Sequence, residues 1–203
     1  SNDQNRWLNN FTHIVSHNIR SHNSNISGIV SLLESSKGTV EFEHLVGMLK
    51  NCTDKLGETI SNLSEYIVLQ TNADKQYKAI NIHEEVNKTC SAINHLIAES
   101  GAIVNNETDP ALSIQLVPSY IESILLNLIG NAIKYRAKDR QAVIRISHQK
   151  VNGFQCLRIE DNGMGIDLDK HKESIFGMFQ TFHGNQDAVG FGLFITKNQV
   201  EAM

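Results

Sequence analysis

The feature that most constrains the fold of this chain is the absence of proline from residues 3–75, where apolar side chains recur every three or four positions. This is the spacing of one face of an α-helix, and no proline interrupts the helical hydrogen bonds. The turn-like residues 35–39, with Gly38 suited to end a helix, divide the stretch into two helices. We expect the inner face of the first helix to hold Leu8, Phe11, Val15, Asn18, His22, Asn25, Ile29 and Leu32, with Ile26, Val30 and Leu33 widening the apolar side. We expect that of the second to hold Leu45, Leu49, Cys52, Leu56, Ile60, Leu63 and Ile67.

Two such helices, packed as an antiparallel hairpin, cannot bury both of their apolar faces by themselves. Pairing two hairpins into a four-helix bundle buries these faces, and a symmetric homodimer is the simplest way to supply the second pair. The alternative is that the helices dock on the second half of the same chain. We expect the homodimer.

A polar stripe follows the opposite side of the first helix, and His17 lies in its middle. A neutral imidazole offers a lone pair for nucleophilic attack, so His17 is a candidate for covalent chemistry. The alternatives are a plain surface histidine or a metal site, because His13 lies one helical turn before His17. His22 lies on the apolar face and is expected to pack in the core.

Residues 76–203 show a different pattern, in which short apolar or alternating runs separate helical segments. Helices are predicted over 83–100 and from Pro118, since proline favours the first turn of a helix. Strands are predicted at 79–82, 102–105, 112–117, 142–149 and 154–160, the last two joined by a turn at residues 152–153. The chain is therefore predicted to be α+β, with a helical hairpin followed by an α/β sandwich in which helices cover a mixed sheet.

Composition excludes several classes of function. The net charge is −4 and no long basic block occurs, which argues against nucleic-acid binding. No apolar run is long enough to span a bilayer and no signal peptide is visible, so no membrane contact is expected of these residues. Membrane attachment of a longer parent protein is left open. The three cysteines are far apart and form no CxxC pair, which argues against a disulfide or zinc scaffold. Unpaired cysteines favour a reducing compartment, so we expect a cytoplasmic location.

Three clusters in the second half carry candidate chemistry, and the first comprises Asn127, Asn131, Lys134 and Tyr135. Their spacing puts them on one face of a helix that is otherwise apolar. An amide oxygen can take one position around Mg²⁺, and a lysine can neutralise a phosphate oxygen. The cluster therefore suits a magnesium-bound polyphosphate, and a solvated polar face is the alternative.

The second cluster, Asp161-Asn162-Gly163-Met164-Gly165-Ile166, follows a predicted strand. A carboxylate at a strand end can accept a hydrogen bond from an exocyclic amine such as that of adenine, and the two glycines let the backbone approach a flat ring. The alternatives are an ordinary Asp-Asn-Gly turn or a weak calcium loop with Asp167 and Asp169.

The third cluster places Gly190 and Gly192 before Leu193 at the start of a helix, where free N–H groups can face phosphate. Residues 167–189, between the second and third clusters, carry Phe176, Phe179 and Phe182 among polar residues. We predict that they form a mobile lid whose aromatic side chains close over a ligand.

In this order, the three clusters and residues 175–179, Ile-Phe-Gly-Met-Phe, resemble the four nucleotide-binding boxes of the sensor histidine kinases, which are Bergerat-fold ATPases. Residues 16–21, Ser-His-Asn-Ile-Arg-Ser, resemble the segment around the phosphorylated histidine of that family. The resemblance covers nearly the whole chain. It implies a homodimeric protein-histidine kinase that uses ATP and Mg²⁺ and passes the phosphoryl group to an aspartate in the receiver domain of a response regulator.

The resemblance also implies domains and residue roles. Residues 3–75 would be the dimerisation and histidine-phosphotransfer domain, and residues 76–203 the catalytic ATP-binding domain. His17 would accept the γ-phosphoryl group, Asn131 would coordinate Mg²⁺ and Asp161 would select adenine. The other nucleotide-binding positions would be Asn127, Lys134, Tyr135, Gly163, Gly165, Ile166, Phe176, Phe179, Gly190, Gly192 and Leu193.

Several positions depart from the family pattern. Asn18 follows the acceptor where relatives carry Asp or Glu as a general base, so autophosphorylation is expected to be slow or to use another proton acceptor. Ser21 stands where many relatives have Thr or Asn for dephosphorylation, and Thr181 replaces a basic residue of the lid. Asn18, Thr181 and the short C-terminus favour the alternative of a degenerate histidine kinase, a dimeric scaffold or phosphotransfer module with weak or no ATP turnover. The intact Asn131, Asp161, Gly163 and Gly165 oppose this alternative.

The sequence ends at Met203, where relatives continue into a further pair of strands. The resemblance therefore implies an ATP-binding domain that is truncated at its C-terminus, with an exposed sheet edge. We expect low stability of this half in isolation, which a melting measurement would test.

Overall fold

A computed structural model describes residues 2–37, 40–70, 76–177, 180 and 190–203. The chain separates into two compact units, the first comprising residues up to 66 and the second beginning at residue 67. The predicted domain boundary between residues 75 and 76 stays a prediction. Within the described residues, none of the helices combines the length and the apolarity needed to cross a bilayer.

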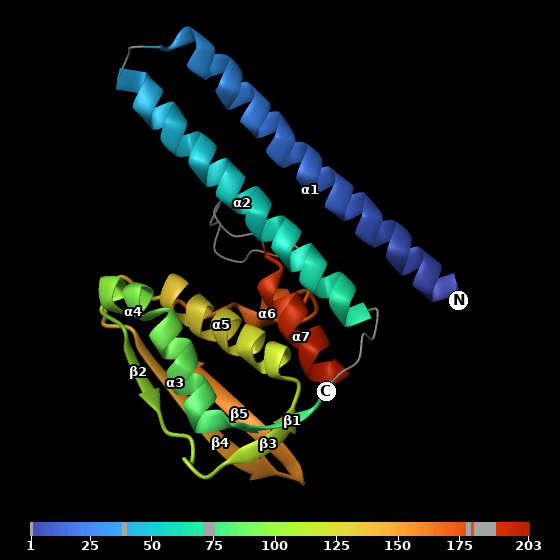
Figure 1. Cartoon of the computed structure of the whole chain (residues 1–203), viewed down its shortest axis with the longest axis vertical. Coiled ribbons are helices and arrows are strands. Elements are labelled where there is room, and N and C mark those ends of the chain that lie inside the picture. Colours follow the sequence, from blue (N-terminus) through green and yellow to red (C-terminus); the bar gives the residue numbers. More distant parts are fainter. Residues whose placement is uncertain (1, 38–39, 71–75, 178–179, 181–189) are drawn as a thin grey trace. The chain divides into compact units, whose positions relative to one another are not determined.

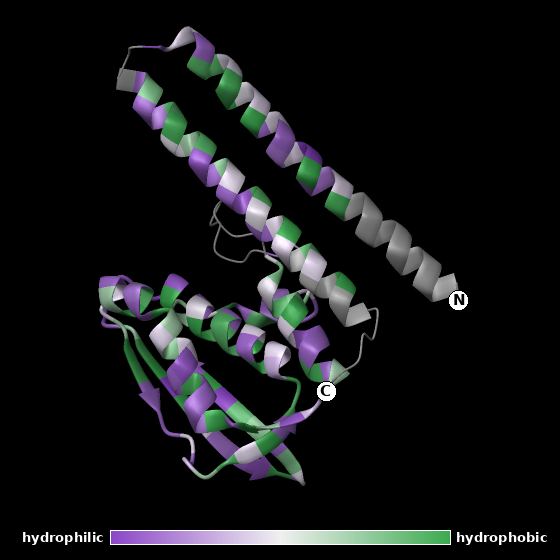
Figure 2. Ribbon diagram, in the orientation of Figure 1, coloured by the Kyte–Doolittle hydropathy of each residue, from purple (hydrophilic) through white to green (hydrophobic). Residues whose placement is uncertain are grey.

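The first unit is built from two long antiparallel helices, α1 (Asn2–Ser35) and α2 (Val40–Gln70), of which only the last residues of α2, from 67 on, fall in the second unit (Figure 1). Both were predicted, and the connection lies where the turn-like residues were recognised. Glu41 and Glu43 occupy the first turn of α2, where acidic side chains complement the partial positive charge of a helix N-terminus. Figure 2 shows apolar and polar residues interleaved along the coloured parts of both helices.

The inner face of α1 differs from the predicted one near its C-terminal end. Ile29 is buried, and Ile26 and Leu33 are half-buried, whereas Asn25 is exposed and the side chain of Leu32 is 54% exposed. Ile26 and Leu33 therefore lie on the packed side, as expected for residues that widen the apolar side, whereas the expected positions of Asn25 and Leu32 on the inner face were wrong. The physical reason is that a helix has 3.6 residues per turn, so a stripe of alternating three- and four-residue steps, which averages 3.5, drifts slowly around a straight helix.

The inner face of α2 includes Leu45 and Leu63, which are buried as predicted. Ile60 and Ile67 were predicted on the same face, but their side chains are 50% and 54% exposed, because the same drift carries these positions around the helix. Thr59 is also buried, and its Oγ1 lies 3.5 Å from Nε2 of His22 on α1. His22 is half-buried, so it lies on the packed side of α1 as the apolar stripe predicted.

The second unit is an α/β sandwich, as predicted, in which the helices lie over one face of the strands (Figure 1). Its elements are β1 (Lys78–Asn81), α3 (Ile82–Ala92), α4 (Asn94–Ser100), β2 (Ile103–Asn106), β3 (Ser113–Leu116), α5 (Pro118–Lys134), β4 (Val143–Val151), β5 (Phe154–Asp161), α6 (Leu168–His171) and α7 (Gly192–Ala202).

The strands form two sheets where the sequence predicted one. Strand β1 pairs with β3 in an antiparallel two-stranded sheet. The other sheet has the order β2-β4-β5, with β2 parallel to β4 and β4 antiparallel to β5, so it is mixed as expected. Asn152 and Gly153 both have positive φ, 51° and 88°, which is the conformation that a tight two-residue hairpin turn needs.

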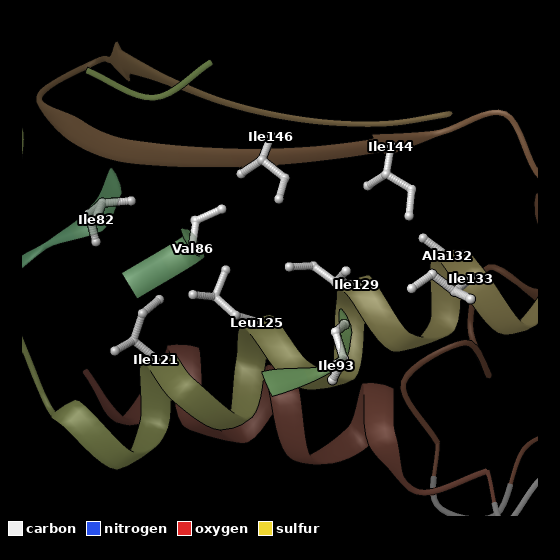
Figure 3. Close-up of a cluster of buried hydrophobic side chains, with 10 residues drawn as sticks. All are labelled: Ile82, Val86, Ile93, Ile121, Leu125, Ile129, Ala132, Ile133, Ile144 and Ile146. Atoms are coloured by element: carbon white, nitrogen blue, oxygen red, sulfur yellow. The ribbon is translucent and has the colours of Figure 1, made fainter. Parts of the chain in front are cut away.

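The single helix predicted over residues 83–100 was wrong, because Ile93 interrupts it. This residue has φ −104° and ψ 20°, and it ends α3 and precedes α4. Ile93 is buried and belongs to the core cluster, so the bend brings an apolar side chain into the core (Figure 3).

The core of the second unit fixes the position of α5. Ile121, Leu125 and Ile129 lie along one side of α5, and they pack in a cluster with Ile144 and Ile146 of β4 (Figure 3). Because this side of α5 is tightly packed in the core, the residues on its other side have a fixed position at the surface of the unit.

Candidate functional site

The polar residues of α5 lie together, as the sequence predicted. Asn127 and Asn131 are half-buried one helical turn apart, and Nδ2 of Asn131 donates a hydrogen bond of 3.2 Å to Oδ1 of Asn127. Lys134 is exposed at the end of the helix, with its Nζ 5.7 Å from the centre of the Tyr135 ring. Two amides and a cation are therefore presented by one side of a helix whose other side is buried.

Helix α7 begins against this row of amides. Nδ2 of Asn127 donates a hydrogen bond of 2.6 Å to Oγ1 of Thr196, one turn into α7. A Cβ atom on Gly192 would lie only 2.8 Å from Cγ and 2.9 Å from Nδ2 of Asn127. Gly192 is thus required for the close approach of the two helices, in addition to the predicted role of its segment in binding phosphate. Gly190 has φ 68°, and Leu193 is half-buried.

Asp161 ends β5 and is exposed, as predicted. The backbone N–H of Gly163 donates a hydrogen bond of 2.8 Å to Oδ1 of Asp161, and the N–H of Met164 donates one of 3.0 Å to the carbonyl of Tyr135 at the end of α5. A Cβ atom on Gly163 would lie 2.7 Å from both Asp161 Oδ1 and Tyr135 O. Gly163 is therefore the residue that brings the carboxylate to the end of α5. In the same loop, Gly165 has φ 69° and Ile166 is half-buried.

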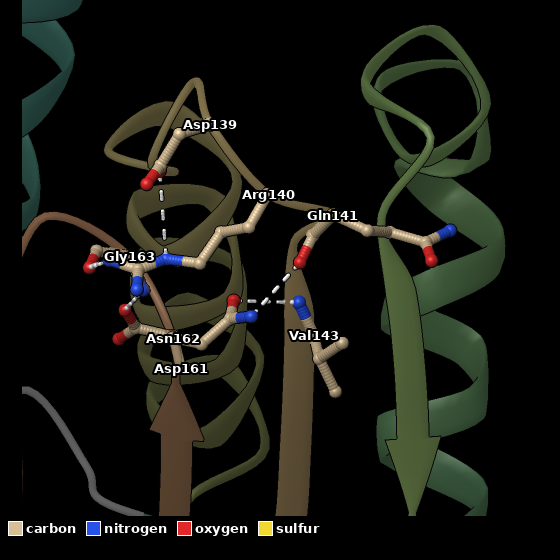
Figure 4. A network of polar contacts seen from close by, with 7 residues as sticks. All are labelled: Asp139, Arg140, Gln141, Val143, Asp161, Asn162 and Gly163. Atoms are coloured by element: carbon tan, nitrogen blue, oxygen red, sulfur yellow. Dashed lines mark hydrogen bonds and ion pairs between the residues drawn. The ribbon is translucent and has the colours of Figure 1, made fainter.

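The loop that carries Asp161 is tied to β4 by Asn162, whose role was not predicted from the sequence. Oδ1 of Asn162 accepts from the N–H of Val143 at 2.9 Å, and its Nδ2 donates to the carbonyl of Gln141 at 2.9 Å (Figure 4). Nη2 of Arg140 also donates to the carbonyl of Gly163 at 3.3 Å. The only sequence signal was the Asp-Asn-Gly turn itself, since short polar side chains in turns often bond to nearby backbone.

The residues after this loop show no sign of the calcium site considered as an alternative. Asp167 caps α6, its carboxylate accepting from the Lys170 N–H at 3.4 Å and pairing with Lys170 Nζ at 2.6 Å. The bond with Lys170 holds the pKa of Asp167 below its usual range. Within the described part of the chain, no group of three or more His, Cys, Asp or Glu residues could hold a metal ion.

The predicted lid is described only in part. Phe176 is 45% exposed, and Nζ of Lys197 on α7 lies 5.8 Å from the centre of its ring. Phe179, Thr181 and Phe182 lie outside the described residues, so the closing of this segment over a ligand stays a prediction.

His17 is exposed on α1, as its position in the polar stripe predicted. Ser21, one turn further along the helix, is also exposed, and Asn18 is half-buried. The candidate phosphoacceptor is therefore accessible to other molecules.

The chain resembles known signalling proteins along most of its length. Residues 117–203 match the family described as histidine kinase-, DNA gyrase B-, and HSP90-like ATPase. Cyanobacterial phytochrome A of Nostoc sp. is 24% identical over 97% of this chain, and sensor protein RprX of Bacteroides fragilis is 25% identical over 91%. The chain spans only 26% and 37%, respectively, of these two relatives.

Solved structures of histidine kinases share the fold. Histidine kinase AdeS of Acinetobacter baumannii superposes with a TM-score of 0.73 at 20% identity, over 92% of this chain and 87% of that one. Histidine kinase ThkA, solved in complex with the response regulator protein TrrA, superposes with a TM-score of 0.70 at 22% identity, over 89% of this chain and 53% of that one.

Proposed function

Because this chain carries a sensor histidine kinase core, whose residues 117–203 belong to the histidine kinase-, DNA gyrase B- and HSP90-like ATPase family, we propose that it transfers the γ-phosphoryl group of ATP to His17. The phosphoryl group then passes to an aspartate in the receiver domain of a response regulator. The observation that carries the proposal is the amide pair of α5, Asn127 and Asn131, held beside the glycine that opens α7.

Adenine recognition is assigned to Asp161. One of its oxygens accepts the N–H of Gly163 at 2.8 Å, and a carboxylate has a second oxygen that can accept from the exocyclic amine of adenine. The N–H of Gly163 thereby orients the carboxylate before the nucleotide arrives. Gly165, Ile166 and Phe176 would contact the base, and the segment from Gly190 to Leu193 would face the phosphates.

The residues of α5 fit a magnesium-bound triphosphate. Asn131 would offer its amide oxygen to Mg²⁺, a hard cation that prefers oxygen ligands and leaves most of its positions to water and phosphate. The ion would neutralise part of the charge that develops on the phosphates during transfer. Lys134 is exposed and positively charged, so it can neutralise a further phosphate oxygen, with Tyr135 beside it.

In the transfer step, a ring nitrogen of His17 attacks the γ-phosphorus. The new N–P bond forms as the P–O bond to the leaving ADP breaks, and the imidazole must lose its N–H proton. Asn18 cannot take this proton, so water or a phosphate oxygen accepts it, and we expect a slow reaction. Ser21 is exposed one helical turn after His17, where it could take part in dephosphorylation of the phosphohistidine.

We further propose that the protein acts as a homodimer through the helical hairpin, residues 3–75. A single hairpin leaves large apolar side chains between 39% and 54% exposed on both helices, and a second copy forming a four-helix bundle would cover them. These exposed residues, among those described, are Ile19, Val30, Leu32, Val46, Met48, Ile60 and Ile67. Residues 76–203 would be the ATP-binding domain, and the three free cysteines support a cytoplasmic location.

Incubation of the chain with γ-labelled ATP and Mg²⁺ tests the kinase. We expect an acid-labile label that His17→Ala abolishes, while His44→Ala, which removes another exposed histidine of the hairpin, retains it. Nucleotide binding without any label would favour the scaffold or phosphotransfer alternative. A chain that binds no nucleotide in the presence of Mg²⁺ would refute the proposed function. Transfer of the label to a purified receiver domain tests the second step.

A further inference from the structure

Two hydrogen bonds connect Thr196 on α7 to Asn131 on α5 through Asn127. Asn127 Nδ2 donates to Thr196 Oγ1 at 2.6 Å, and Asn131 Nδ2 donates to Asn127 Oδ1 at 3.2 Å. Thr196 is 7% exposed, and both amides are half-buried, so these bonds are shielded from water. No sequence motif marks Thr196 for a role in the site.

The two bonds fix which way each amide faces. An amide side chain has a donating NH₂ group on one side and an accepting oxygen on the other. Since Thr196 accepts from the NH₂ group of Asn127, the oxygen of Asn127 faces Asn131. That oxygen in turn accepts from the NH₂ group of Asn131, which leaves the oxygen of Asn131 on the opposite side, away from Asn127.

The start of α7 holds Asn127 from a second direction. Gly192 lies one turn before Thr196, and a Cβ atom there would lie 2.8 Å from Cγ of Asn127. The amide of Asn127 is therefore enclosed between the backbone of Gly192 and the hydroxyl of Thr196. This enclosure prevents Asn127 from moving away from Asn131 without displacing α7.

We infer that Thr196 is a positioning residue, which acts through Asn127 to present the amide oxygen of Asn131 to the magnesium ion that accompanies the nucleotide. The inference rests on the proposed function, because it takes Asn131 as the metal ligand. Partners that orient a metal ligand typically change metal affinity by 10- to 100-fold when they are removed.

Nucleotide binding measured with and without Mg²⁺ tests the inference without any turnover. We would titrate a non-hydrolysable ATP analogue into the full chain by calorimetry, once in EDTA and once with excess Mg²⁺. In the wild type we expect Mg²⁺ to tighten binding. In Thr196→Val, which replaces the hydroxyl by a methyl group of similar size, we expect this gain to fall by about tenfold or to disappear. Thr196→Ser keeps the hydroxyl and should restore the gain.

Two further measurements separate positioning from damage to the fold. Binding in EDTA should be the same in all three proteins, because adenine is recognised by Asp161 in another part of the site. In an Asn127→Ala background, Thr196→Val should not change the gain in affinity from Mg²⁺ any further. A residue that acts only through Asn127 has no effect once Asn127 is removed.

The outcomes distinguish the two hypotheses. A wild type that binds no nucleotide under either condition refutes the proposed function, and the inference with it. A wild type with a gain from Mg²⁺ that Thr196→Val retains in full refutes the inference alone. Loss of binding in EDTA by Thr196→Val, or additive effects with Asn127→Ala, would also overturn it, because Thr196 would then act on the fold or by another route.

Discussion

Replacing Gly163 with alanine places a methyl group where the structure has no room for one. The new Cβ would lie 2.7 Å from Asp161 Oδ1 and 2.7 Å from Tyr135 O. Nonbonded contacts become favourable only at about 3.5 Å, so both oxygens are far too close. The Tyr135 carbonyl is backbone at the end of α5 and accepts the Met164 N–H at 3.0 Å, so it cannot easily move. The Asp161 carboxylate is the group that must rotate away.

The cost follows from these two contacts. Overpacking of this kind destabilises a protein by about 1–3 kcal/mol. Rotation of Asp161 also breaks its 2.8 Å bond with the Gly163 N–H, which contributes about 0.5–1.5 kcal/mol. We therefore expect Gly163→Ala to lower the free energy of unfolding of the second unit by about 2–4 kcal/mol. It should also weaken binding of ATP by about 10-fold or more, because the carboxylate proposed to select adenine is displaced.

Hydrogen exchange of the β4 and β5 amides in the full chain measures this loss, because those amides report on opening of the second unit alone. Gly130→Ala is the matched control: Gly130 lies inside α5 with nothing near its missing Cβ, and alanine there should stabilise by about 0.5–1 kcal/mol. If Gly163→Ala left exchange of these amides unchanged, or slowed it as the control should, the steric reasoning would be refuted.

Three other predictions concern separate parts of the chain. Asn18→Asp should speed autophosphorylation by at least about tenfold, because a carboxylate can take the proton of His17, and a rate equal to that of Asn18→Ala would contradict this. Asn162→Ala removes two bonds to the backbone at Gln141 and Val143, so we expect a loss of about 1–3 kcal/mol in the same exchange assay, and no change at β4 would count against it. Burial raises the pKa of the Cys90 thiol, so its reactive thiolate forms only at higher pH. Alkylation followed by mass spectrometry should therefore be slower at Cys90 in the native chain than in urea, and equal rates would contradict this.

The parts of the fold that the sequence predicted are those set by local patterns. The proline-free repeat predicted α1 and α2, Pro118 marked the start of α5, and Asn152-Gly153 marked the turn between β4 and β5. The same holds for the candidate site, because Asn127 and Asn131 belong to one helix and their spacing alone puts them together.

The features that were missed depend on contacts between distant segments. The interruption at Ile93 is decided by the core that this side chain enters, and the division into two sheets depends on which strands pair. The bond between Asn127 and Thr196 joins residues 69 positions apart, and no local pattern marks Thr196 as a partner. The error at Leu32 arose because a stripe of alternating three- and four-residue steps drifts around a helix of 3.6 residues per turn.

The parallel pairing of β2 with β4 affects how the second unit can form during synthesis. Ile103 pairs with Val143, 40 positions later, and β3 and α5 lie between them. Closing so long a loop lowers the entropy of the chain before the hydrogen bonds between β2 and β4 can offset that cost. Pairing of these two strands is therefore expected to be slow. Until β4 has left the ribosome, β2 has no neighbour on this side, and its apolar residues Ile103 and Val104 are open to association with other nascent chains.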